Sequence, residues 1–163
     1  MEKIEERKLT LLKEVWGFTT FRTVQSKIID NVLAGQDTLV IMPTGGGKSL
    51  CFQLPALLFS GLTVVVSPLI ALMNDQVQAL KISGVKVATI HSNLSASELA
   101  KVESELLKGE IKLLYISPER INSPGFSAFL QRLNVNLFAI DEAHCVSVWG
   151  NDFRPDYVLL NKI

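Results

Sequence analysis

The 163-residue chain has few cysteines, few aromatic residues and no excess of either charge. Cys51 and Cys145 form no C-x-x-C pair, and the two histidines lie at no metal-ligand spacing, so we expect reduced thiols and no metal site built on cysteine and histidine. Lysine plus arginine and aspartate plus glutamate number 16 each, which excludes a uniformly basic nucleic-acid-binding protein. Any contact with phosphate groups must therefore be local.

Long apolar runs are also missing. The longest runs, such as 54–59, are far shorter than the roughly 20 residues that span a bilayer. Residues 1–8 mix both charge signs and lack the apolar core of a signal peptide. We expect no membrane partner and an intracellular protein, cytoplasmic or, in a eukaryote, nuclear. The composition, 48% hydrophobic and 20% charged, excludes a disordered chain, and the length fits one domain.

Short β-branched apolar runs alternate with longer stretches of helical spacing. Strands are expected at 38–42, 63–67, 86–91, 112–117 and 137–141. They are nearly continuous in valine, isoleucine and leucine, which is typical of strands buried on both faces of a parallel sheet. Helices are expected at 5–16, 24–33, 48–59, 69–81, 95–108 and 123–133. This alternation predicts an α/β fold, a three-layer sandwich with a mostly parallel sheet.

One of the expected helices carries signals at both of its ends. Ser95 with Glu98 fits a capping box at its start. Gly109 fits a glycine stop at its end.

A glycine-rich loop, 42–49, lies between the first expected strand and a helix. Its glycines let the backbone turn tightly and point N–H groups at an anion, and the following helix adds the positive end of its dipole. Lys48 is expected to reach the β- and γ-phosphates of a nucleotide, and Ser49 to ligate Mg²⁺. The strict pattern begins with glycine, where this chain has Met42. The alternative is a glycine-rich turn followed by a chance Lys-Ser.

Two acids follow the apolar run that ends at Ile140. In an open parallel sheet ligands bind beyond the carboxyl ends of the strands, so Asp141, Glu142 and the glycine-rich loop can converge on one site. Asp141 is expected to hold Mg²⁺, and Glu142 to orient and deprotonate the attacking water. The candidate catalytic residues are therefore Lys48, Asp141 and Glu142. A solvated acidic turn is the alternative.

Residues 141–144 spell a DEAH box, and together with 44–49 they resemble the superfamily 2 helicases. Four segments resemble the RecQ DNA helicases: 42–57, 64–77, 115–121 and 141–157. Trp16-Gly17-Phe18-x-x-Phe21-Arg22-x-x-Gln25 resembles the adenine-recognition motif of that family. The resemblance covers nearly the whole chain from about residue 12. It implies N-terminal helices with the adenine motif over 1–35 and a truncated first RecA-like ATPase lobe over 36–163, which we treat together as one domain.

The resemblance also implies roles for individual residues. It implies that a nucleotide is bound by Phe18, stacked on adenine, by Arg22 and Gln25 at the edge of the base, and by Thr44, Gly45, Gly46, Gly47, Lys48 and Ser49. It implies that DNA is bound by Ser67, Pro68, Ser117 and Arg120, and by Trp149, Phe153 and Arg154 in an aromatic-rich loop. The chain departs from the family pattern at Thr23, Val148 and Asn151.

Several of these residues also fit structural roles when the sequence is considered alone. Composition favours an exposed helical glutamine at position 25. Phe21 fits the core better than a binding site. Ser67 and Ser117, each followed by proline, fit helix caps as well as phosphate contacts. Trp149 and Phe153 fit packing beneath their loop as well as base stacking.

The expected function is that of an ATP- and Mg²⁺-dependent DNA helicase of RecQ type, moving 3′ to 5′ on single-stranded DNA and unwinding duplexes. The chain would be its first motor lobe, with little or no activity alone. Its partners would be ATP, single-stranded and partly duplex DNA, and a second RecA-like lobe. One alternative is an RNA helicase or nucleic-acid remodelling ATPase, against which the segment 145–157 argues. Another is a non-catalytic nucleotide-binding or interaction module, against which Lys48, Asp141 and Glu142 argue.

Overall fold

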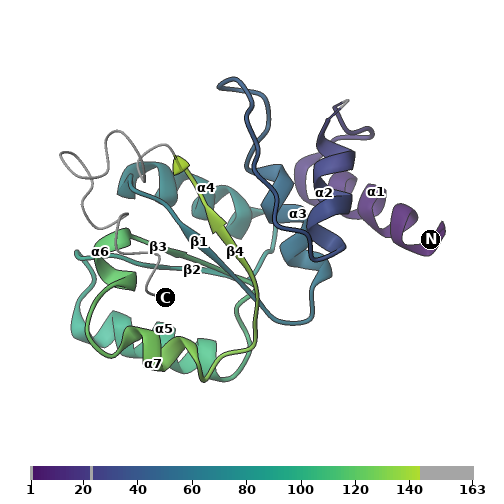
Figure 1. Cartoon of the computed structure of the whole chain (residues 1–163). Helices are drawn as coiled ribbons and strands as arrows, with labels where there is room; N and C mark the ends of the chain where they lie inside the picture. Colours follow the sequence, from purple (N-terminus) through teal and green to yellow (C-terminus); the bar gives the residue numbers. More distant parts are fainter. Residues whose placement is uncertain (1, 23, 144–163) are drawn as a thin grey trace. The chain divides into compact units, whose positions relative to one another are not determined.

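The computed structural model describes residues 2–22 and 24–143. The chain divides into two compact units, with the boundary between Ser60 and Gly61. The first unit is helical and the second is built around a sheet (Figure 1). None of the helices in the described ranges combines the length and the apolar character needed to cross a bilayer.

Three helices and the loop between the last two make up the first unit. The helices are α1 (Glu2–Trp16), α2 (Gln25–Leu33) and α3 (Leu50–Leu58). Each contributes to one buried apolar cluster, which contains Leu12, Ile29, Leu50 and Leu54. Trp16 and Phe21 pack against this cluster, so the prediction that Phe21 belongs to the core is confirmed.

The segment 38–42 forms no strand, in contrast to the prediction from its apolar sequence. The side chain of Leu39 is 82% exposed and that of Ile41 is 90% exposed. An apolar run becomes a strand only where a neighbouring strand completes its hydrogen bonds. Among the described residues no strand pairs with this segment, so the predicted buried strand before the glycine-rich loop is wrong.

The second unit contains a four-stranded, fully parallel sheet with the order β2-β3-β1-β4. The strands are β1 (Leu62–Val66), β2 (Val87–Ile90), β3 (Leu113–Ile116) and β4 (Val135–Ile140). The helices are α4 (Ile70–Ile82), α5 (Ala96–Leu107), α6 (Pro118–Ile121) and α7 (Phe126–Leu130). Figure 1 shows α4 on one face of the sheet and α5 and α7 on the other, which confirms the predicted α/β fold.

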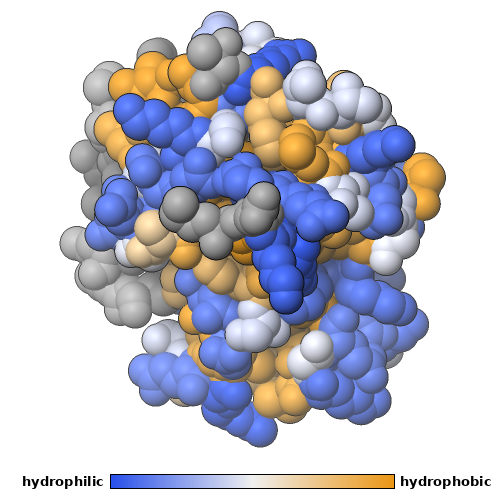
Figure 2. Space-filling view, turned by 90° about the vertical axis from the view of Figure 1, so that its right-hand side faces the viewer, coloured by the Kyte–Doolittle hydropathy of each residue, from blue (hydrophilic) through white to orange (hydrophobic). Residues whose placement is uncertain are grey.

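Burial differs between the central and outer strands. β1 and β3 are buried along their whole length, as their continuous apolar sequences predict. β4 forms an edge of the described sheet, and its side chains alternate between exposed and partly buried, with Phe138 45% and Ile140 38% exposed. The prediction that every strand is buried on both faces is therefore wrong for β4. Figure 2 shows that hydrophobic residues reach the surface among hydrophilic ones on one face of the molecule.

The predicted ends of α5 are confirmed. The Ser95 hydroxyl accepts the Glu98 backbone N–H at 3.3 Å, and the Glu98 carboxylate accepts the Ser95 N–H at 2.8 Å. The Ser95 hydroxyl also donates to this carboxylate at 2.6 Å, which lowers the pKa of Glu98. Gly109 follows the helix with a φ of 70°, in the left-handed region that favours glycine.

The predicted helix over 123–133 is much shorter in the structure, where only Phe126–Leu130 is helical. Gly125 precedes it with a left-handed φ of 82°, which is incompatible with a helix running through this position. The segment Pro118–Ile121, which precedes the predicted helix, forms a separate short helix, α6.

Candidate functional site

The glycine-rich loop 42–49 has the backbone that an anion-binding loop requires. Gly45 and Gly47 have φ angles of 77° and 86°, which glycine adopts without steric strain. The Gly46 N–H donates to the Pro43 carbonyl at 3.0 Å and closes a tight turn. α3 begins directly after the loop, so the positive end of its helix dipole lies at the end of the loop.

Arg22 and Gln25 are bonded to this loop. The Gln25 side-chain Nε2 donates to the Gly47 carbonyl at 3.2 Å, and its Oε1 accepts the Arg22 backbone N–H at 2.9 Å. The Arg22 Nη1 donates to the Gly45 carbonyl at 2.6 Å. Gln25 is only 4% exposed, so the exposed glutamine that composition favours is wrong. The structure thus joins the predicted adenine-recognition residues to the predicted phosphate-binding loop.

Gly47 is required by its neighbours as well as by its φ angle. A Cβ atom at this position would lie 2.3 Å from the Gln25 Nε2. A Cβ atom at Gly46 would lie 2.9 Å from the Pro43 carbonyl oxygen. The close packing of the loop therefore depends on two consecutive glycines.

The other predicted nucleotide-binding residues of this unit are exposed or make contacts that a ligand could replace. Phe18 is 56% exposed, in contrast to Trp16 and Phe21. The Lys48 Nζ donates to the Met42 carbonyl at 3.1 Å, a neutral acceptor that a phosphate could replace. The Ser49 side chain makes no capping hydrogen bond within the described residues, although it occupies the N-cap position of α3. Thr44 is exposed in the loop. These donors and the open aromatic ring fit a nucleoside triphosphate with Mg²⁺.

Cys51 lies in the first turn of α3 and is buried. Its Sγ lies 3.8 Å from the Gly47 carbonyl oxygen, and burial raises the pKa of its thiol to about 11. A thiol with this pKa is protonated at neutral pH, so Cys51 packs beneath the loop and is not a nucleophile.

In the second unit the structure brings Ser67, Ser117 and Asp141 together at the carboxyl ends of the strands. Each follows directly after a strand, and the three strands are neighbours. The Ser67 N–H donates to the Ile116 carbonyl at 3.1 Å, and the Asp141 N–H donates to the Val66 carbonyl at 2.8 Å. The parallel register therefore aligns two predicted DNA contacts with one predicted Mg²⁺ ligand.

Three of the predicted DNA-binding residues carry buried polar atoms that lack a partner. Ser67 and Ser117 are each 1% exposed, and their hydroxyl oxygens, like the Arg120 Nε, have no hydrogen-bond partner among the described residues. Pro68, beside Ser67, is partly exposed. Most buried polar atoms in proteins are hydrogen-bonded, so these three atoms are unusual, as is the Thr63 Oγ1 within β1.

Glu142 has an unusual backbone. Its φ is 52°, in the left-handed region that non-glycine residues rarely adopt, and its N–H donates to the Asp141 Oδ1 at 3.1 Å. Such strained angles occur preferentially at active sites. The backbone therefore singles out Glu142, which the sequence predicts to be catalytic.

The sequence reasoning missed Lys8, which is fully buried in the first unit. Its ammonium group pairs with Glu5 at 2.6 Å and with Asp30, and it lies 5.8 Å from the centre of the Phe21 ring. Burial lowers the pKa of Lys8, but the hydrogen bonds that its ammonium group donates to Asp30 and Glu5 outweigh this effect and raise it. The three-residue spacing of Glu5 and Lys8, which allows an ion pair on a helix, was the one feature of the sequence that indicated this contact.

The remaining predicted DNA contacts, Trp149, Phe153 and Arg154, lie outside the described residues, as do Val148 and Asn151. Lys48 and Ser49 belong to the first unit, and Asp141 and Glu142 to the second.

Comparison with known proteins identifies relatives over most of the chain. The family model for DEAD/DEAH box helicases matches residues 22–163. The chain is 46% identical over 155 residues to the ATP-dependent DNA helicase RecQ of Haemophilus influenzae, covering 95% of this chain and 25% of that protein. It is 51% identical over 152 residues to RecQ of Bacillus subtilis (93% and 26%). It is 47% identical over 167 residues to ATP-dependent DNA helicase Q5 of Mus musculus (98% and 17%). The chain thus spans between 17% and 26% of the length of these relatives.

A solved structure shares the fold. The crystal structure of a hypothetical ATP-dependent RNA helicase from Sulfolobus tokodaii has a TM-score of 0.71 and 23% identity, and the match covers 94% of this chain and 45% of that one.

Proposed function

Because the chain belongs to the DEAD/DEAH box helicase family, we propose that it forms the first ATP-binding lobe of an ATP-dependent DNA helicase of RecQ type. The whole enzyme would couple ATP hydrolysis to 3′ to 5′ movement on single-stranded DNA and to duplex unwinding. Identities of 46–51% to bacterial RecQ helicases support this type. The observation that carries the proposal is the pair of hydrogen bonds from Arg22 and Gln25 to the glycine-rich loop, which combines base and phosphate recognition.

The chemistry of Gln25 fits adenine. A glutamine amide has two N–H donors and an oxygen with two acceptor sites. Gln25 uses one donor for Gly47 and one acceptor site for the Arg22 N–H. One donor and one acceptor site remain, which is the complement of the N7 acceptor and N6 donor of adenine. Phe18 would then stack on the base, and Arg22 would bond its edge.

Phosphate binding and hydrolysis would fall to Lys48, Ser49, Asp141 and Glu142. Lys48 would exchange the Met42 carbonyl for the β- and γ-phosphates. Ser49 and Asp141 would hold Mg²⁺ through oxygen atoms, and Glu142 would orient the attacking water and accept its proton. Bound Mg²⁺ would neutralise charge on the phosphate oxygens. The left-handed backbone of Glu142 supports a functional role for this turn.

DNA would be held at the carboxyl ends of β1 and β3, by Ser67 and Ser117, and by Arg120 in α6. Their unpartnered polar atoms support contacts with DNA phosphates, directly or through water. The Asp141 N–H is bonded to Val66, the residue before Ser67.

Nucleotide binding by the chain tests the proposal directly. We expect ATP to bind more tightly than GTP, which lacks the N6 donor. Gln25→Ala should reduce the discrimination between ATP and GTP, whereas Lys48→Ala should weaken both about equally. Equal binding of ATP and GTP by the unaltered chain would contradict the assignment of Gln25.

The choice between DNA and RNA requires a chain extended to the length of its relatives. We expect its ATPase to be stimulated by single-stranded DNA more than by single-stranded RNA. Stimulation by RNA alone would contradict the RecQ type and favour an RNA helicase.

A further inference from the structure

The strand β2 has an open edge. It pairs with β3 on one side and is the last strand of the described sheet on the other. The Lys86 carbonyl accepts the Lys112 N–H at 2.8 Å, and the Ile90 carbonyl accepts the Ser117 N–H at 3.2 Å. The backbone groups of Lys86 and Ile90 therefore point toward β3.

The backbone groups of Val87 and Thr89 point the other way. Successive residues of an edge strand direct their N–H and C=O groups alternately toward and away from the paired strand. With Lys86 and Ile90 directed at β3, Val87 and Thr89 offer two N–H donors and two carbonyl acceptors to the open side. This is the pattern that a further extended chain needs for pairing.

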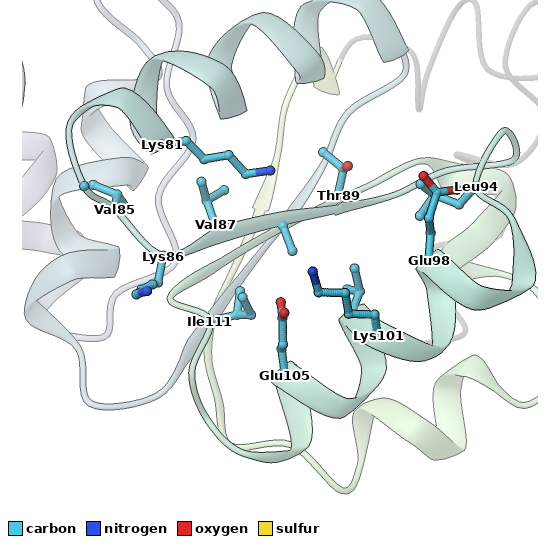
Figure 3. A pocket seen from close by; sticks show the side chains of 13 residues that line it. Lys81, Val85, Lys86, Val87, Thr89, Leu94, Glu98, Lys101, Glu105 and Ile111 are labelled. Atoms are coloured by element: carbon cyan, nitrogen blue, oxygen red, sulfur yellow. The ribbon is translucent and has the colours of Figure 1, made fainter.

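A groove of about 520 Å³ runs along this edge, between α4 and α5. Figure 3 shows Lys81 extending from the end of α4 and Lys101 rising from α5, so that their ammonium groups approach the groove from opposite sides of the strand. Lys86 lies at one end of the groove. Val102 and Ile111 contribute apolar surface to the lining.

The groove favours a negatively charged occupant. Within the described residues, Lys81, Lys86 and Lys101 make no ion pair. The lining also carries two carboxylates: Glu98, which accepts the hydrogen bonds of the capping box of α5, and Glu105. Three lysines against two carboxylates leave the lining with one net positive charge.

We propose that this groove binds an extended acidic peptide segment of a partner protein, which pairs with β2 as an added strand. A peptide backbone matches the alternating donors and acceptors of Val87 and Thr89, whereas a nucleic-acid backbone has no such pattern. The side chains of the added strand alternate between the two faces of the sheet, so acidic residues can reach Lys81 on one face and Lys101 on the other. None of the residues that line the groove is among those assigned to nucleotide or DNA binding.

Binding can be measured by the fluorescence anisotropy of a labelled, terminally blocked Glu-Glu-Val-Glu-Glu peptide, which in an extended conformation carries acidic side chains on both faces. We expect saturable binding that weakens with added salt. The double substitution Lys81→Glu/Lys101→Glu should reduce the affinity by about tenfold or more, because two attractive charges become repulsive. The control Lys13→Glu/Lys108→Glu makes the same change of net charge at exposed positions outside the groove and should have a much smaller effect.

A second pair of variants tests the backbone pairing. Thr89→Pro removes an N–H that points to the open edge, so an edge strand can tolerate it. Thr89→Val keeps the N–H and the branched shape. We expect a loss of about tenfold for proline and a change within about twofold for valine. A peptide with N-methylated backbone amides keeps its charge and should fail to bind the unaltered chain, which tests pairing even if Thr89→Pro unfolds.

Three results would overturn the proposal. The first is no binding of the acidic peptide at millimolar concentration. The second is equal binding of the N-methylated peptide. The third is a single-stranded oligonucleotide that displaces the peptide and binds equally well to the Thr89→Pro and Thr89→Val variants, which would make the groove a nucleic-acid contact.

Discussion

Buried polar side chains differ in their hydrogen-bond partners between the two units. Among the described residues of the helical unit, the buried side chains of Lys8, Gln25 and Gln53 all have partners. In the described part of the sheet unit, the buried Tyr115 hydroxyl donates to Gln76 at 2.9 Å, but four other buried polar atoms have no partner: Thr63 Oγ1, Ser67 Oγ, Ser117 Oγ and Arg120 Nε. A partnered polar group fixes the position of its neighbours, whereas an unpartnered one carries a free-energy cost until water or a ligand reaches it.

This contrast separates two ways of preparing a binding site. The hydrogen bonds of Gln25 and Arg22 hold the glycine-rich loop in shape before any ligand is present. At the carboxyl ends of the strands, Ser67 and Ser117 are aligned by the register of β1 and β3, but their hydroxyl groups have no hydrogen-bond partner among the described residues. We infer that the glycine-rich loop has its shape before a ligand binds, whereas the Ser67 and Ser117 hydroxyl groups gain hydrogen-bond partners only when a ligand binds.

The largest effect is expected at Gly47. Gly47→Ala places a Cβ atom against the Gln25 amide and forces alanine into a left-handed angle that alone costs about 1–2 kcal/mol. Together these should lower the affinity for ATP at least about 100-fold, measured by calorimetry.

Gly35→Ala is the matched control for this substitution. Gly35 has a φ of 72°, but a Cβ atom there would meet no described atom within 4 Å. The control should lose stability without losing affinity for ATP. Equal affinities of the two variants would show that preorganisation by Gln25 does not matter.

The next largest effect is expected for Gln25→Leu. The substitution leaves the Gly47 carbonyl and the Arg22 N–H without their partner, which should cost about 2 kcal/mol in the free energy of unfolding. Urea denaturation of the chain measures this. No change in stability would contradict the view that Gln25 holds the loop.

A smaller effect is expected for Lys8→Met. Methionine keeps the apolar volume, and Glu5 and Asp30 are about half exposed, so their carboxylates remain hydrated. The loss should be about 1 kcal/mol in the free energy of unfolding, compared with the exposed control Lys13→Met.

The pH dependence of the same variant gives an independent check. Hydrogen bonds to Asp30 and Glu5, opposed by burial, raise the pKa of Lys8 above its value in the unfolded chain, about 10.4. The stabilisation is therefore fully present below that pH and is lost as the pH rises through the pKa of the folded state. The difference between the unaltered chain and Lys8→Met should be constant near neutral pH and shrink in strongly alkaline solution. A difference that grows there would contradict the pairing.

The smallest effect on stability is expected for Ser67→Ala and Ser117→Ala. Removing a hydroxyl that has no partner breaks no hydrogen bond, so each should change the free energy of unfolding by less than about 0.5 kcal/mol. Ser95→Ala is the partnered control, since it removes the cap of α5 and should cost about 1 kcal/mol. If Ser67→Ala were as destabilising as Ser95→Ala, the Ser67 hydroxyl would have a hydrogen-bond partner, in contrast to this account.

Features that depend on neighbouring residues in the sequence could be predicted well. The capping box of Ser95 and Glu98 and the stop at Gly109 involve residues within one or two turns, and both are present. The same holds for the positive φ angles of Gly45 and Gly47. The helix predicted over 123–133 was wrong because the left-handed backbone at Gly125 outweighs helical spacing.

Features that depend on distant residues could not be predicted. Whether 38–42 becomes a strand depends on a partner strand, and its apolar sequence does not reveal whether one is present. The burial of Gln25 and Lys8 depends on Gly47 and Asp30, each 22 positions away. The backbone angle of Glu142 follows from the turn after β4 and has no signature in residue type. Candidate site residues could be proposed from the sequence, but not the hydrogen bonds that Arg22 and Gln25 make with the glycine-rich loop.

The central claim is that the glycine-rich loop holds the phosphates of ATP while Asp141 holds Mg²⁺. Calorimetric titration of the chain with ATP, with and without Mg²⁺, tests it most directly when Lys48→Ala and Asp141→Asn are included. The account predicts that Mg²⁺ strengthens binding to the unaltered chain, that Lys48→Ala loses binding, and that Asp141→Asn binds ATP without any gain from Mg²⁺. Failure of the unaltered chain to bind ATP, or an undiminished gain from Mg²⁺ in Asp141→Asn, would contradict it.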